Sequence, residues 1–184
     1  MGGKVIISPD MLGRAELFAD RCVDTVDYSY RGQTNKDKIR RDILIGKLGE
    51  EVAAAEIGEG FSPDYGVYSA KQKSWDMDFG SYHVKTQVSA QSMRYGESWV
   101  FQGRDKHIFG PRATGSVVFV RIADDFSYGR VRFIGDVSWL HSNGLFKLPV
   151  RRELRDKFVV YYKDLLSVSR VKNKSSAGDL RQNT

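Results

Sequence analysis

The feature that most constrains the fold is a change of hydrophobic period along the chain. From Thr34 to Ile57, apolar residues recur at the spacing of one helix face, and Gly58 then stops this pattern. From Val67 onward, apolar and polar residues alternate, as they do in strands that bury one face. The pattern therefore predicts a long helix, with a capping box at Thr34, followed by a block of strands.

The other expected elements follow from similar local signals. Ser8 and Pro9 suit the first turn of a helix that ends before Tyr28. Expected later elements are strands at 75–79 and 82–87 joined by a turn at 80–81, strands at 116–122 and 129–134, a short helix near 137–140 and a last strand at 157–162. One domain is expected over 1–168, and the polar segment 169–184 is expected to be disordered.

Charge and cysteine content narrow the class of protein. A formal charge of +6 over 184 residues favours a polyanionic partner, because Lys and Arg neutralise phosphates. The single cysteine, Cys22, excludes a disulfide or a cysteine-based zinc site within one chain and favours a reducing cytoplasm. No apolar run approaches the roughly 18 residues of a membrane span, so no membrane partner is expected.

Basic residues cluster near the start of the long helix. This segment is the candidate nucleic-acid-binding surface, and a solvated helix face without a ligand would give the same pattern. Its members are Lys36, Lys38, Arg40, Arg41 and Lys47.

Glu50 is the most informative residue of the long helix. Helical geometry aligns it with apolar residues such as Ile43 and Ala54, so its carboxylate is expected to face the interior. A buried carboxylate must be neutralised, hydrogen-bonded or bound to a cation, and pairing with an arginine would suffice. The next residue, Glu51, is expected to be a surface charge.

Polar residues also share faces of the first two expected strands. Asp76 and Asp78 lie on one face of their strand, and His83, Lys85 and Gln87 lie on one face of the next. These five side chains are expected to form one inward or cleft-facing surface. A half-exposed antiparallel sheet without a function would show the same alternation.

Two short segments carry a resemblance to a known family. The helix LIGKLGEEVAA and the strand region WDMDFGSYHVKTQ resemble the PD-(D/E)XK nuclease superfamily, and FVVYYKDLLSV resembles the closing strand of its small members. The resemblance implies an α/β, restriction-endonuclease-like core in which helices flank a central mixed β-sheet. It also implies Mg²⁺, with Mn²⁺ as the alternative, and DNA as the substrate.

The resemblance assigns roles to particular residues. The implied metal ligands are Glu50, Asp76, Asp78 and the backbone carbonyl of Val84. Lys85 would lie beside the attacking water and the scissile phosphate, and the remaining implied catalytic residues are His83 and Gln87. Mg²⁺ prefers hard oxygen ligands, and a lysine can neutralise charge that develops on phosphate.

His83 departs from the family pattern, which has Asp or Glu two residues before the lysine. An imidazole is a better ligand for Mn²⁺ than for Mg²⁺. His83 would therefore bind a softer metal, contact phosphate while Asp78 supplies the carboxylate, or mark a degenerate site. The expected function is a metal-dependent DNA endonuclease, and the alternative is a nucleic-acid-binding module that has lost catalysis. Cutting both strands at one place would require a homodimer.

Overall fold

The computed structural model describes residues 2–25, 34–58, 60–67, 77–78, 82–103, 109–149 and 157–168. The helices and strands, in chain order, are β1 (Val5–Ile6), α1 (Pro9–Thr25), α2 (Lys36–Ile57), β2 (Ser62–Pro63), β3 (Met77–Asp78), β4 (Tyr82–Val88), α3 (Ser89–Tyr95), β5 (Ser98–Gln102), β6 (Ser116–Ile122), β7 (Tyr128–Asp136), α5 (Val137–Ser142) and β8 (Lys157–Tyr161). A further helical segment covers 162–168. The expected polar tail at 169–184 lies outside the described residues.

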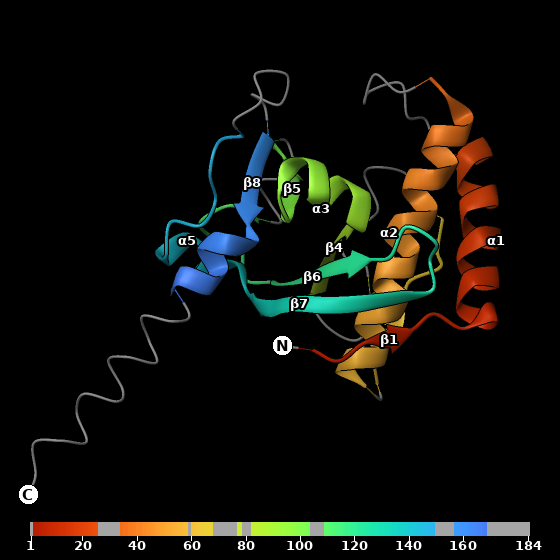
Figure 1. Ribbon diagram of the computed structural model, residues 1–184, viewed down its shortest axis with the longest axis horizontal. Helices are drawn as coiled ribbons and strands as arrows, with labels where there is room; N and C mark the ends of the chain where they lie inside the picture. Colours follow the sequence, from red (N-terminus) through yellow and green to blue (C-terminus); the bar gives the residue numbers. More distant parts are fainter. Residues whose placement is uncertain are drawn as a thin grey trace, which may run out of the picture.

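The strands β1, β7, β6 and β4 form a mixed sheet in that order. β4 runs parallel to β6, whereas β6 and β7 form an antiparallel hairpin around the acidic turn at 124–125. Figure 1 shows α1 and α2 side by side on one flank of this sheet, with β5, β8 and α5 on the other flank. The expected class, an α/β fold with a mixed sheet flanked by helices, is confirmed.

Side-chain caps fix the starts of the two long helices. Ser8 Oγ accepts a hydrogen bond from the Met11 amide at 3.2 Å, as expected for the start of α1. The cap of α2 is Asn35 rather than Thr34, because Asn35 Oδ1 accepts from the Lys38 amide at 3.0 Å. Gly58 ends α2 with a φ of 98°, a left-handed conformation that favours glycine. The sequence therefore located α2 correctly, with its cap displaced by one residue.

Two apolar cores lie on opposite faces of the mixed sheet. The first core joins α1 and α2 to the sheet through buried side chains that include Leu48, Val52, Val118 and Val120. Each such side chain contributes about 1.5–3 kcal/mol when it is fully buried. The second core lies between the sheet and the β5–β8 pair. The sheet is therefore covered on both faces.

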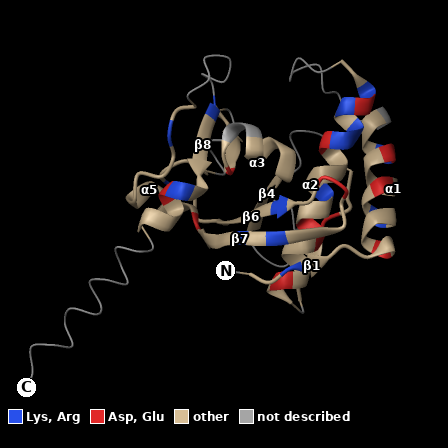
Figure 2. Cartoon of the chain, in the orientation of Figure 1, with Lys and Arg blue, Asp and Glu red and all other residues tan. Residues whose placement is uncertain are grey.

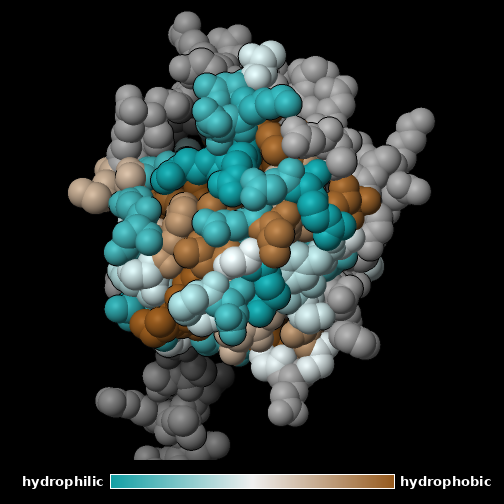
Figure 3. Space-filling view, turned by 90° about the vertical axis from the view of Figure 1, so that its right-hand side faces the viewer, coloured by the Kyte–Doolittle hydropathy of each residue, from teal (hydrophilic) through white to brown (hydrophobic). Residues whose placement is uncertain are grey.

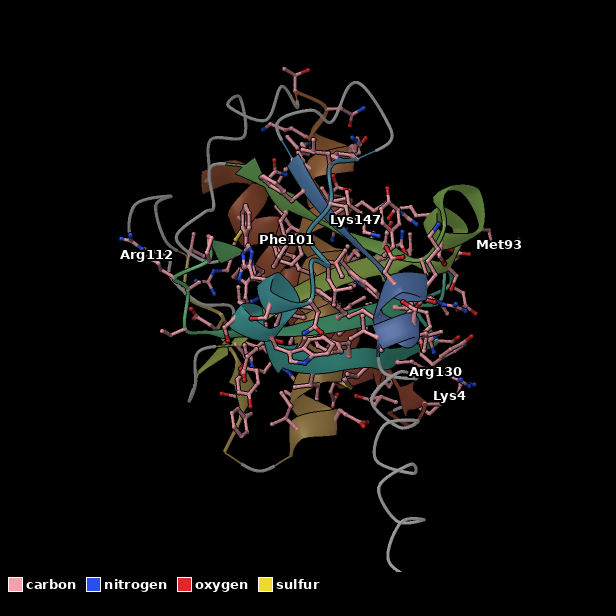
Figure 4. All side chains as sticks on the ribbon, turned by 90° about the vertical axis from the view of Figure 1, so that its left-hand side faces the viewer. Lys4, Met93, Phe101, Arg112, Arg130 and Lys147 are labelled. Atoms are coloured by element: carbon pink, nitrogen blue, oxygen red, sulfur yellow. The ribbon has the colours of Figure 1, made fainter. Side chains whose placement is uncertain are left out.

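The strand β5 was not expected from the sequence, and it supplies the antiparallel partner of β8. Its Trp99 ring stacks on Phe119 with 4.5 Å between ring centroids, and the Trp99 indole donates to the Val120 carbonyl at 3.1 Å. Figure 4 shows Phe101, also on β5, beside β8, with Met93, Arg130 and Lys4 farther out. This aromatic layer covers the second face of the sheet.

The expected hairpin between residues 75–79 and 82–87 is wrong. Among the described residues, β3 pairs with β2, whereas β4 pairs in parallel with β6. The alternation in β4 was expected to give an inward or cleft-facing polar surface, with a half-exposed sheet as the alternative. His83 and Val84, on opposite faces, are both only 8% exposed, so β4 is not half-exposed at this point. A parallel strand covered on both faces explains this burial.

Candidate functional site

Helix α2 crosses β4 at Gly49 and Thr86. A Cβ atom added to Gly49 would overlap Thr86 Oγ1 and lie 2.9 Å from the Thr86 Cβ, so only glycine fits at this point of the helix. Glu50 follows Gly49 along α2, and Lys85 precedes Thr86 along β4. The crossing therefore brings the segments that carry Glu50 and Lys85 to the same level of the sheet.

His83, Lys85 and Gln87 share one face of β4, as predicted. Their register partners on the parallel strand β6 include Val117 and Phe119, which belong to the second core. Lys85 is half-buried, and its Nζ lies 5.2 Å from the centroid of the Phe101 ring of β5. This face of β4 therefore points toward the β5–β8 layer, while the alternate residues Val84 and Thr86 point toward α2.

Gln87 ties β4 to the start of β5. Its Oε1 accepts from the Ser98 amide at 3.1 Å, and its Nε2 donates to the Gly96 carbonyl at 3.4 Å. Only 6% of Gln87 is exposed. Both ends of the amide form hydrogen bonds inside the protein, and a catalytic role for Gln87 stays a prediction.

His83 is a buried imidazole on the same face as Lys85. It lies two residues before Lys85, on a strand that the β5–β8 layer covers. A role for His83 in metal choice or phosphate contact stays a prediction.

Glu50 is buried, as expected, and its cation is a lysine of the same helix. Lys47 Nζ lies 2.5 Å from Glu50 Oε2, and it also donates to the backbone carbonyl of Asp64. Lys47 is only 2% exposed and Glu50 only 5%. Lys47 therefore does not belong to an exposed basic surface, which corrects its assignment to the nucleic-acid-binding cluster.

Glu51 is not a surface charge either. Arg14 of α1 holds both of its carboxylate oxygens, with Nε at 2.8 Å and Nη2 at 2.9 Å, and the Tyr65 hydroxyl donates to the same carboxylate. Hydrogen bonding to Glu51 raises the pKa of Arg14, and burial, followed by the same carboxylate, raises the pKa of Tyr65. The sequence could not show this, because α1 and the segment at 60–67 cover that side of α2 only in the folded chain.

The basic residues at the start of α2 differ in their exposure and in the contacts that they make. Lys36, Lys38 and Arg41 are exposed, whereas Arg40 holds Asp20 of α1 through Nε at 2.5 Å and Nη2 at 3.1 Å. This hydrogen bonding lowers the pKa of Asp20. Figure 2 shows acidic residues interspersed with basic ones along α1 and α2. Exposed cations are therefore present here, but the surface carries both signs of charge.

The outer face over α1 carries no single large apolar area in the view of Figure 3. It is mainly hydrophilic, with separate hydrophobic patches between polar side chains. Leu17 of α1 is 67% exposed. Isolated exposed apolar residues of this kind are ordinary on folded proteins.

The expected acidic ligands are described only in part. Asp76 lies outside the described residues, and Asp78 belongs to β3, which pairs with β2 next to α2. The side chain of Val84 lies in the first core, and a role for its carbonyl stays a prediction. Within the described segments, no group of three acidic, histidine or cysteine side chains is gathered as in a metal site.

Comparisons with protein-family models, with curated proteins and with solved structures found no significant match to this chain. No helix among the described residues combines the length and the apolar composition needed to cross a membrane.

Proposed function

We propose that the chain is a metal-dependent DNA endonuclease that hydrolyses phosphodiester bonds. The observation that carries this proposal is the crossing of α2 and β4, because it brings the segments that carry a buried glutamate and a half-buried lysine to one level of the sheet, with Glu50 on the α2 side of β4 and Lys85 on the side of the β5–β8 layer. A buried carboxylate and a lysine ammonium are the groups that metal-assisted phosphodiester hydrolysis uses. The two segments that resemble the nuclease superfamily are the ones that meet here.

Of the proposed acidic ligands, Glu50 is the one whose side chain the structure describes. It supplies a hard carboxylate oxygen in a buried position, where Lys47 balances its charge in the absence of metal. Asp76 and Asp78 are the proposed further ligands, with Mg²⁺ or Mn²⁺ as the ion. When bound, such an ion lowers the pKa of a bound water and stabilises charge on the phosphate.

The role proposed for Lys85 is electrostatic. As the water oxygen bonds to phosphorus and the bond to the leaving sugar oxygen breaks, negative charge grows on the phosphoryl oxygens. The Lys85 ammonium would neutralise that charge and orient the water. Partial burial under Phe101 favours this role, because a charge shielded from solvent interacts more strongly with its neighbours.

A catalytically inactive nucleic-acid-binding module is the second candidate, and two observations favour it. The side-chain amide of Gln87 forms hydrogen bonds with backbone groups through both its oxygen and its nitrogen. The charge of the Glu50 carboxylate is balanced by that of Lys47. The surface that binds nucleic acid would then include the exposed residues Lys36, Lys38 and Arg41. Binding to DNA without cleavage in either Mg²⁺ or Mn²⁺ would establish this candidate.

Cleavage of supercoiled plasmid DNA tests the first proposal. Wild type should give nicked or linear product only when Mg²⁺ or Mn²⁺ is added. Lys85→Ala should abolish most cleavage while affinity for uncut DNA falls by no more than about tenfold, or 1.4 kcal/mol. Lys163→Ala, which removes the same charge from an exposed position in the helical segment 162–168, is the matched control and should cleave normally. Equal cleavage by wild type and Lys85→Ala would exclude the proposed role of Lys85.

The same plasmid assay addresses assembly, because direct linearisation favours a homodimer with two active sites over a nicking monomer. The single buried cysteine, Cys22, suits a reducing compartment, and we propose the cytoplasm.

A further inference from the structure

Lys47 occupies an enclosed position between α1, α2 and the segment at 60–67. Its side chain is 1% exposed, and its Nζ lies 2.5 Å from Glu50 Oε2. The same atom donates to the Asp64 carbonyl and lies 4.2 Å from the centroid of the Phe18 ring and 5.1 Å from that of Tyr65. An ammonium has three hydrogens, and a carboxylate, a carbonyl and an aromatic face satisfy them here.

Two ion pairs of the described residues lie around this position. Glu51 is matched by Arg14, and Glu50 is matched by Lys47. A divalent ion at Glu50 would therefore add positive charge to a carboxylate that is already neutralised, and like charges in a buried region repel strongly.

Stability alone gives no reason for this pair. Replacing a buried ion pair with apolar side chains of similar volume is often neutral or stabilising, because removing two charges from water is costly. Leu48 and Val52, on the same helix, show that apolar side chains pack well here. The ion pair therefore calls for an explanation in terms of what the carboxylate does.

We propose that Lys47 is a tethered counter-ion for Glu50, which neutralises this carboxylate in the metal-free protein and competes with a divalent metal ion for it. The competition rests on the proposed metal-dependent function, whereas the neutralisation does not. The bond to the Asp64 carbonyl gives the ammonium a second anchor beside β2, whose partner strand β3 carries Asp78.

The neutralisation is tested by thermal unfolding of Lys47→Met, Glu50→Met and the double variant in metal-free buffer. Each single variant breaks the buried ion pair and removes one of its two charges, so its Tm should fall by on the order of 10 °C. The double variant should recover most of that loss. Arg40→Met, which breaks the exposed pair with Asp20, is the control and should change Tm by no more than about 2–4 °C. A double variant no more stable than the weaker single variant would overturn the proposal.

The competition is tested by calorimetric titration with Mn²⁺ in the absence of DNA. Lys47→Met should bind Mn²⁺ at least about tenfold more tightly than wild type, because the carboxylate is released to the ion. Glu50→Met should bind it more weakly than wild type. Equal affinity of wild type and Lys47→Met, or no binding to either, would overturn the competition. If Lys47→Met does not fold, Lys47→Gln takes its place in the titration, because glutamine keeps a hydrogen-bond donor for Glu50 and removes the charge.

These outcomes are separate from those of the plasmid assay. A chain that cleaves DNA but shows no coupling between Lys47 and Glu50 would lose only this inference. A chain that shows the coupling but never cleaves DNA would lose the proposed endonuclease function.

Discussion

Replacing Gly49 with alanine should test the crossing of α2 and β4 on which the proposed site depends. The new Cβ would overlap Thr86 Oγ1 and lie 3.0 Å from Thr86 Cγ2, so the helix or the strand must shift. Overpacking of this kind costs about 1–3 kcal/mol, whereas alanine gains up to about 1 kcal/mol over glycine in a helix interior. We expect Gly49→Ala to be destabilised by roughly 1–2 kcal/mol overall.

Gly46→Ala is the matched control on the same helix. Among the described residues, no atom beyond the backbone of the helix itself and the two chain neighbours lies within 4 Å of a Cβ built on Gly46. The gain in helix propensity therefore applies alone, and stability should rise by about 0.5–1 kcal/mol. Urea unfolding measures both variants, with a change of midpoint at constant slope as the readout. Adding Thr86→Ala to Gly49→Ala should recover part of the loss. If Gly49→Ala were as stable as Gly46→Ala, α2 would not cross β4 at this point.

Three further measurements address other parts of the molecule. Cleavage by wild type should favour Mn²⁺ over Mg²⁺, and His83→Ala should reduce that preference; equal activity in both metals for both proteins would exclude His83 from the metal site. Replacing Lys36, Lys38 and Arg41 together with alanine should flatten the dependence of DNA affinity on salt, by about 0.9 in the logarithmic slope per lost phosphate contact. An unchanged slope would place the DNA elsewhere. Burial raises the pKa of Tyr65, so its contribution to stability is complete below pH 10, the usual tyrosine value, and declines as pH rises above it. Tyr65→Phe should therefore lose less Tm than wild type between pH 9 and about 11, and a parallel decline would contradict this assignment.

Elements with strong local signals were predictable from the sequence. The α2 helix, the β6–β7 hairpin and the α5 helix all follow from periodicity, caps and turn residues within a few positions. The pairing of β4 with β6 was not predictable in the same way, because the two strands are far apart in the chain and adjacent strands were assumed to pair. The short strand β5 was missed because five residues give little periodic signal.

In the candidate site too, features that depend on local periodicity could be predicted, whereas features that depend on tertiary packing could not. The shared face of His83 and Lys85 followed from strand alternation, and the inward position of Glu50 followed from the helical period. The burial of Lys47 and Glu51 could not be predicted, because every residue from Lys47 to Ala53 is buried. A helix segment enclosed on all sides has no polar face, so helical periodicity cannot identify its exposed residues.

The division of the apolar interior into two cores has a consequence for the order in which the chain folds during synthesis. All the buried residues of the first core, from Ile7 to Val131, are made before β7 ends, so this core can assemble early. The second core needs Val160 and Leu165, and β5 receives its partner only when β8 emerges. Until then β8 and Leu165 are not in place beside Trp99 and Phe101. The nascent chain therefore exposes an aromatic surface that chaperones would bind.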